Sequence, residues 1–185
     1  MTKRIYFMGA QSTGKTTLAS WLSGELMLPL LPEVARGVAR QMKKSIEEIR
    51  KSEELVNEFQ ERIFLTQCEQ ESFLQDIGFV SDRGLDNLAY AAEHTNALHD
   101  ILRRNTEIFR EAVHRLANST VFFIRPEKAV LTDDGERPDA DLEWESVVRI
   151  DSMIKFTLQY FGIEYHEITW LDLDARKKFV LRRVK

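Results

Sequence analysis

The eight residues from Gly9 to Thr16 constrain the fold of this chain more than any other feature. They read Gly-Ala-Gln-Ser-Thr-Gly-Lys-Thr, which fits the spacing G-x-x-x-x-G-K-[ST]. The apolar run Ile5-Tyr6-Phe7-Met8 precedes them, and Leu18, Leu22 and Leu26 follow at helical spacing. A buried strand, a tight glycine loop and a helix are therefore expected in direct succession. In that context this spacing predicts a phosphate-binding loop (P-loop), and a chance match is the weaker interpretation.

Each residue type in this loop has a role in holding phosphate. Gly9 and Gly14 permit the tight backbone geometry that turns N–H groups and a helix N-terminus toward phosphate oxygens. We expect Lys15 to bridge the β- and γ-phosphates and Thr16 to ligate Mg²⁺ through its hydroxyl. The other residues expected around the nucleotide are Gln11, Ser12, Thr13 and Thr17. The motif thus predicts a nucleoside triphosphate, ATP or a similar one, together with Mg²⁺.

Segments typical of strands and of helices alternate along the chain. Short apolar runs predict strands at 3–8, 28–31, 77–80, 120–124 and 164–168. Helical periodicity predicts helices at 16–27, 34–42, 52–75, 85–93, 97–116, 142–161 and 172–184. Such alternation favours an α/β fold of three layers, in which helices cover both faces of a parallel sheet. A length of 185 residues fits one domain spanning 1–185.

A carboxylate and an arginine follow the third predicted strand. Asp82 comes directly after Phe79-Val80-Ser81, at the sheet edge where ligands of open α/β sheets collect. A carboxylate there holds Mg²⁺ directly or through water. Arg83 is placed to meet a phosphate of the acceptor or of the donor. The alternative is that Asp82 caps a helix and Arg83 forms a surface ion pair.

A second acidic and basic pair follows the second predicted strand, in Pro32-Glu33-Val34-Ala35-Arg36. Glu33 is a candidate base for an acceptor hydroxyl, or a group that orients a sugar hydroxyl. Arg36 is a candidate clamp for a carboxylate, phosphate or base carbonyl of the acceptor. A plain surface pair of Glu33 with Arg36 is the alternative.

The stretch 125–141 has the most loop-like composition in the chain, with Pro126, Asp133-Asp134-Gly135 and Pro138. We expect a mobile lid over about 126–141. Arg137 lies within it, and an arginine on a closing loop can reach the transferring phosphoryl group and stabilise its charge. A solvated charged loop is the alternative for Arg137.

The composition limits the classes of binding partner and the cellular compartment that we expect for this chain. The net charge of −4 gives no global attraction to nucleic acid or anionic membranes. No apolar run approaches the ~20 residues of a membrane span, and the single cysteine, Cys68, favours a reducing compartment, the cytoplasm. The basic clusters Arg103-Arg104, Arg176-Lys177-Lys178 and Arg182-Arg183 are interpreted as solvated helix faces, with a nucleic-acid contact as the alternative.

Four motifs together resemble a known family, the small P-loop nucleoside and nucleotide kinases, and within it the ribosylnicotinamide kinase domain of bacterial NAD-biosynthesis regulators. The motifs are residues 9–17, Pro32 to Arg36, Asp82-Arg83-Gly84 followed by Leu88-Ala89-Tyr90, and Asp134 to Arg137. They occur in the family's order over most of the chain. The first is highly specific for phosphate binding, and the other three are short.

The resemblance implies a five-stranded sheet in the order 2-3-1-4-5 and a lid after the fourth strand. It implies ATP as donor and Mg²⁺ as metal, with Glu33, Asp82 and Arg83 facing the acceptor or the metal. Arg125 and Arg137 are implied to lie near the donor phosphates. Regulators of that kind also carry a DNA-binding module and an adenylyltransferase domain, for which these 185 residues leave no room.

The sequence leaves the acceptor open. The favoured hypothesis is a kinase acting on a hydroxyl or phosphate of a nucleoside, nucleotide or related small molecule. The second is a polynucleotide kinase acting on a modified base, 5-hydroxymethyluracil, in phage DNA. The third is a nucleotide-dependent switch or assembly ATPase without an acceptor, against which Arg83 stands where many such ATPases have a second acidic residue. The oligomeric state is not predicted.

Overall fold

The computed structural model describes residues 2–130, 143–169 and 172–184. Its centre is a five-stranded, all-parallel sheet in the order β2-β3-β1-β4-β5. The strands are β1 Arg4–Met8, β2 Leu30–Leu31, β3 Phe79–Asp82, β4 Thr120–Ile124 and β5 His166–Ile168. The predicted fold class and strand order are confirmed.

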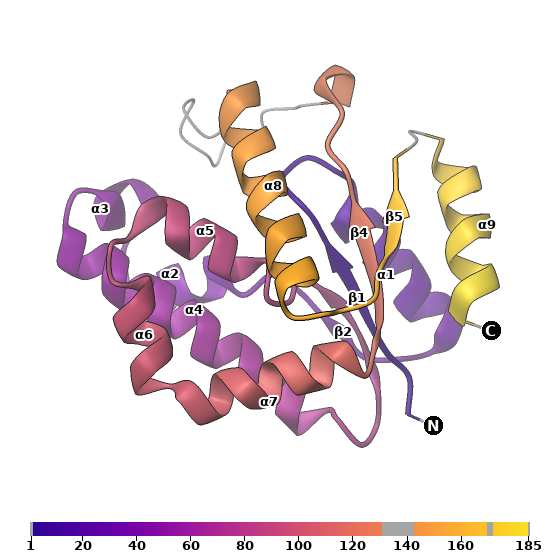
Figure 1. Cartoon of the computed structure of the whole chain (residues 1–185), viewed down its shortest axis with the longest axis horizontal. Helices are drawn as coiled ribbons and strands as arrows, with labels where there is room; N and C mark the ends of the chain where they lie inside the picture. Colours follow the sequence, from indigo (N-terminus) through magenta and orange to yellow (C-terminus); the bar gives the residue numbers. More distant parts are fainter. Residues whose placement is uncertain (1, 131–142, 170–171, 185) are drawn as a thin grey trace.

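Helices cover both faces of this sheet (Figure 1). The helices of the described residues are α1 Lys15–Leu26, α2 Ala35–Gln41, α3 Ile46–Arg50, α4 Glu53–Phe73, α5 Asn87–His94, α6 Leu98–Arg104, α7 Thr106–Ala117, α8 Trp144–Tyr160 and α9 Leu173–Val184, with a 3₁₀ turn at Lys128–Val130. Among the described residues, no helix has the length and apolar character needed to cross a membrane.

The side chains of β1 alternate between the two faces of the sheet, and this alternation explains the layers. Tyr6 and Met8 of β1 face a cluster that contains side chains of α4 to α8, whereas Ile5 and Phe7 face α1 and α9. Both sets are buried, which is why β1 reads as a continuous apolar run. A third cluster joins α2, α3 and the first half of α4, beside the sheet at the left of Figure 1.

Some element ends are shifted, as in β3, which is predicted at 77–80 and observed at Phe79–Asp82, and two regions of helix differ from the predicted ones. The helix predicted at 97–116 is broken at Asn105, whose Nδ2 donates to the Ile101 carbonyl (2.8 Å) and to Glu61 Oε1 (2.9 Å). Side-chain bonds of this kind compete with the helical backbone. The short helix α3 was not predicted; it begins with a capping box between Ser45 and Glu48, and Ile49 packs into the third cluster.

Candidate phosphoryl-transfer site

The loop between β1 and α1 has the backbone of an anion cradle. Gly9 has φ +149°, and a Cβ there would lie 2.3 Å from the Ile124 carbonyl oxygen, so only glycine fits. Ser12 (φ 55°) and Gly14 (φ 83°) are also left-handed, and Gly14 is the N-cap of α1. Left-handed residues in a turn that leads into a helix N-terminus direct successive N–H groups at one concavity.

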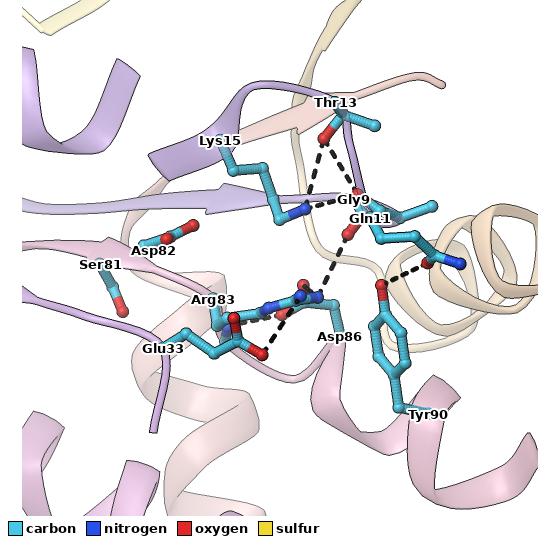
Figure 2. Close-up of polar contacts among 12 residues, drawn as sticks. Gly9, Gln11, Thr13, Lys15, Glu33, Ser81, Asp82, Arg83, Asp86 and Tyr90 are labelled. Carbon is cyan, nitrogen blue, oxygen red and sulfur yellow. Dashed lines mark hydrogen bonds and ion pairs between the residues drawn. The ribbon is translucent and has the colours of Figure 1, made fainter. Parts of the chain in front are cut away.

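The Lys15 ammonium is folded back onto this loop (Figure 2). Its Nζ donates to the Ala10 carbonyl at 2.5 Å and to Thr13 Oγ1 at 3.3 Å. Burial, together with the positive charge of Arg83, lowers the pKa of Lys15 to about 7. The ammonium thus lies where a phosphate anion would supply the opposite charge that favours its protonated form.

A hydroxyl and a carboxylate meet beside the lysine. The register places Asp82 of β3 next to Phe7 of β1, at the edge where the P-loop begins. There the Thr16 hydroxyl donates to Asp82 Oδ2 at 2.5 Å, while Asp82 Oδ1 is buried without a hydrogen-bond partner among the described residues. The alternative of a helix-capping Asp82 is wrong, because Asp86 is the N-cap of α5.

This pair fits magnesium. Mg²⁺ prefers oxygen ligands and is usually held by one or two protein groups, with phosphate oxygens and water completing its shell. In the described part of the chain no cluster of three or more His, Cys, Asp or Glu side chains forms a cage for a metal. The hydroxyl of Thr16 and the unpartnered oxygen of Asp82 are the groups available beside a bound triphosphate.

Arg83 is buried at the tip of β3 and is not a surface residue (4% exposed). Its guanidinium pairs with Glu33 Oε1 (3.6 Å) and Asp86 Oδ2 (3.3 Å), and it lies over the ring of Tyr90 (4.7 Å). Burial alone would lower the pKa of Arg83, but the interactions with Tyr90, Glu33 and Asp86 outweigh it and raise the pKa well above its usual value.

The backbone at Arg83 supports a functional interpretation. Its φ of 140° is rare for a residue with a Cβ, and such strain persists where surrounding contacts fix it. The next residue, Gly84, donates its N–H to Asp86 Oδ1 at 2.6 Å, and a Cβ on it would press against the Tyr6 ring at 3.0 Å. The turn therefore holds Arg83 between Glu33 and Asp86, as Figure 2 shows.

A cavity of about 110 Å³ opens next to these groups. Its polar side is formed by residues of the P-loop, of the segments that follow β2 and β3, and of α5, namely Gln11, Glu33, Arg83, Asn87 and Tyr90. Its apolar side comes from α3 and α4, namely Ile46, Ile49, Val56, Phe59 and Ile63. The Tyr90 hydroxyl donates to Gln11 Oε1 at 2.9 Å and so joins the cavity to the P-loop.

A family model described as an AAA domain matches residues 4–176. The chain belongs to this AAA-domain family.

Solved structures that share the fold of this AAA domain are distant in sequence. A NadR protein in complex with NR is 18% identical (TM-score 0.72), and the alignment covers 99% of this chain and 51% of that one. The AAA domain thus spans about half the length of that NadR chain. A deoxyadenosine kinase from M. mycoides is 12% identical (TM-score 0.64), with 97% of each chain covered. A shikimate kinase from Acinetobacter baumannii in complex with shikimate is 13% identical (TM-score 0.57), with 99% and 91% covered.

These likenesses show the fold of small P-loop kinases, and the predicted resemblance is confirmed at that level. No curated protein is significantly similar to the sequence of the AAA domain.

Two predicted arginines, Arg36 and Arg125, stand apart from the cavity, and a third, Arg137, is not among the described residues. Arg36 is exposed on α2. Arg125, at the end of β4, donates to Asp151 Oδ2 (2.8 Å) and Glu167 Oε1 (2.9 Å), so two carboxylates fix its guanidinium at the sheet edge. Arg137 and most of the predicted lid lie outside the described residues. The roles assigned to these three arginines stay predictions.

Sequence reasoning missed Arg176. The basic cluster at 176–178 predicts a solvated helix face, but Arg176 is buried on the first turns of α9 (6% exposed) and donates from Nη1 to the Thr13 carbonyl at 2.7 Å. The spacing of Arg176, Val180 and Val184, each four residues apart, is the signal that places it on the buried face of the helix.

Proposed function

We propose that this AAA domain is an ATP-dependent kinase that transfers the γ-phosphate to a hydroxyl of a nucleoside, nucleotide or related small molecule. The observation that carries the proposal is the cavity that shares Gln11 with the P-loop and is lined by Glu33 and Arg83. A nucleotide switch needs a phosphate cradle alone. A kinase needs a second site that holds an acceptor against the same phosphates.

In the proposed reaction the acceptor hydroxyl points from the cavity toward the γ-phosphate. Its oxygen bonds to the γ-phosphorus, its proton passes to the Glu33 carboxylate, and the bond to the bridging oxygen breaks so that ADP leaves. Arg83 acts as a positioning residue, because its ion pair with Glu33 fixes the carboxylate at the cavity wall. Lys15 offsets the charge that gathers on the leaving phosphate.

Mg²⁺, when bound through Thr16 and Asp82, would supply further neutralisation of the phosphate charge. Arg137 is proposed to reach the donor phosphates from the lid.

The compartment is proposed to be the cytoplasm, and one domain is proposed for the 185 residues.

The test is acceptor-stimulated ADP release. Purified protein with Mg²⁺ and ATP is offered nucleosides, nucleoside monophosphates, small hydroxyl compounds and duplex DNA containing 5-hydroxymethyluracil. We expect at least one small molecule to stimulate ADP release and to gain the phosphate by mass spectrometry. Lys15→Ala should abolish this turnover without loss of the folded circular-dichroism spectrum, and Lys44→Ala, an exposed lysine on the same chain, should not.

Phosphate on DNA alone would replace the proposal by the polynucleotide alternative. ATP hydrolysis that no acceptor stimulates would replace it by a switch or assembly ATPase.

A further inference from the structure

The charges that line the cavity are already balanced. Two carboxylates, Glu33 and Glu93, face two guanidiniums, Arg50 and Arg83. Arg83 is held between Glu33 and Asp86, and Arg149 pairs with Glu93 at 3.2 Å.

A phosphate on the acceptor would disturb this balance. A phosphomonoester carries about −1.5 to −2 charges near pH 7 and is bound in proteins by guanidinium groups that turn toward it. Arg83 is the buried cation of the cavity, and turning it toward a phosphate would leave the carboxylates of Glu33 and Asp86 without their partner. Removing one member of a buried ion pair is strongly unfavourable. Because Arg83 is held by Glu33 and Asp86, and Arg50 is half-buried beside His94, the cavity favours an acceptor without net negative charge.

Two buried carboxamides face the same cavity from different helices. Gln60 lies on α4 within the apolar face that also carries Val56 and Ile63. Asn87 is the first residue of α5, is 9% exposed, and its Nδ2 has no hydrogen-bond partner among the described residues. Buried polar groups in folded proteins are nearly always paired, so an unpaired amide donor in the wall of a cavity points to a ligand atom that accepts from it.

The remaining walls suit a flat ring. The rings of Phe59 and Tyr90 line the cavity together with aliphatic side chains of α3 and α4. Aromatic and branched apolar walls around a few placed polar groups are typical of sites for heterocycles. A carboxamide offers a donor and an acceptor side by side, which matches ring edges that carry the same two functions.

We infer that the acceptor is an uncharged, nucleoside-like compound without a phosphate, and that Gln60 and Asn87 hydrogen bond the edge of its ring. This inference rests on the proposed kinase function and narrows it. The hydroxyl of the compound faces Glu33, the ring lies against Phe59, and the polar edge of the ring reaches the two carboxamides.

The experiment compares each nucleoside with its own 5′-monophosphate, in turnover and in calorimetric binding without ATP. We expect kcat/KM and affinity for at least one nucleoside to exceed those for its monophosphate by 100-fold or more. Asn87→Asp and Gln60→Glu keep the shape and remove the amide donor, and each should lower acceptor kcat/KM by about 10- to 100-fold while KM for ATP stays unchanged. Asn87→Gln keeps an amide donor at this position, so its acceptor kcat/KM should fall less than that of Asn87→Asp.

Asn118→Asp, an exposed asparagine on the far end of α7, is the matched control and should leave all constants unchanged. Equal or better use of the monophosphate, or variants at 60 and 87 that behave like the control, would overturn the inference. So would the absence of nucleoside binding in calorimetry. If another acceptor then stimulated ADP release, the proposed kinase function would stand and this narrower inference alone would fail.

Discussion

Arg176 and Thr13 are 163 positions apart in the sequence, yet the Arg176 guanidinium donates to the Thr13 carbonyl at 2.7 Å. The last helix is thereby joined to the loop that is expected to hold the triphosphate. Arg176 Nη1 also lies 3.4 Å from the position that a Cβ on Gly14 would take. Its charge is therefore placed beside the cradle, from an element that the motif itself does not include.

This contact predicts a selective effect on nucleotide binding. In Arg176→Met the loop loses a charged hydrogen bond worth about 1.5–3 kcal/mol and a nearby positive charge, so KM for ATP should rise about 10-fold or more. Burial lowers the pKa of Arg176, so removal of the buried cation also relieves a cost and the melting temperature should change little. Arg182→Met, at an exposed position on the same helix, should change neither value. An unaltered KM for ATP in Arg176→Met would contradict a role in nucleotide binding.

Lys15 should take up a proton when a triphosphate binds. With a pKa of about 7 it is mostly neutral at pH 8, and a bound polyanion favours the charged form. Calorimetry of a non-hydrolysable ATP analogue with Mg²⁺ at pH 8, in buffers that differ in ionisation enthalpy, should show uptake approaching one proton per nucleotide. At pH 6 the uptake by Lys15 should be small, because the ammonium is already charged. Heats that do not depend on the buffer at pH 8 would rule this coupling out.

The same pKa predicts how Lys15 affects stability. Because the folded-state pKa is lowered from 10.5 to about 7, the unfolded chain binds the extra proton between these values. The penalty on the folded state is full below pH 7 and disappears as the pH rises toward 10.5. Lys15→Met should therefore raise the unfolding free energy of the nucleotide-free protein at pH 6 to 7 by up to a few kcal/mol, on the order of 1.4 kcal/mol per pKa unit. The melting temperature should rise with it. That gain should shrink at pH 9, whereas Lys44→Met should show none at either pH.

Asp82 should govern the metal requirement. Asp82→Asn keeps the size of the side chain and a group that can contact Thr16, but it removes the negative charge proposed to face Mg²⁺. Loss of one such oxygen is expected to weaken metal binding or turnover about 10- to 100-fold. Titration of Mn²⁺ by electron paramagnetic resonance, with a non-hydrolysable ATP analogue present, reads the affinity directly and does not depend on catalysis. Asp76→Asn, on the loop before β3, is the matched control, and an Asp82→Asn protein with its metal affinity intact would argue against the assignment.

Local patterns predicted those parts of the fold that depend on neighbours in sequence. The limits of β4 at 120–124 and the P-loop conformation are such cases, since an apolar run or a glycine spacing contains the cause in itself. The break at Asn105 depends on Glu61 of another helix, and the burial of Arg176 depends on how α9 packs on the sheet. The cavity could not be predicted, because α3, α4 and α5 bring Ile49, Gln60 and Asn87 together only in the folded chain. The polar Gln60, among the apolar Val56, Phe59 and Ile63 of α4, was a local sign of it.

Arg83 offers a test that separates stability from catalysis. Its guanidinium compensates two carboxylates, one of them buried, so Arg83→Met should destabilise the fold by about 3–5 kcal/mol. Asp86→Asn in the same chain removes one of the carboxylates left without a partner and should recover part of that stability, as measured by urea unfolding. Turnover should not return with it, because the ion pair that positions Glu33 is still missing. Recovery of turnover together with stability would mean that Arg83 supports the fold alone and that Glu33 is positioned by other contacts.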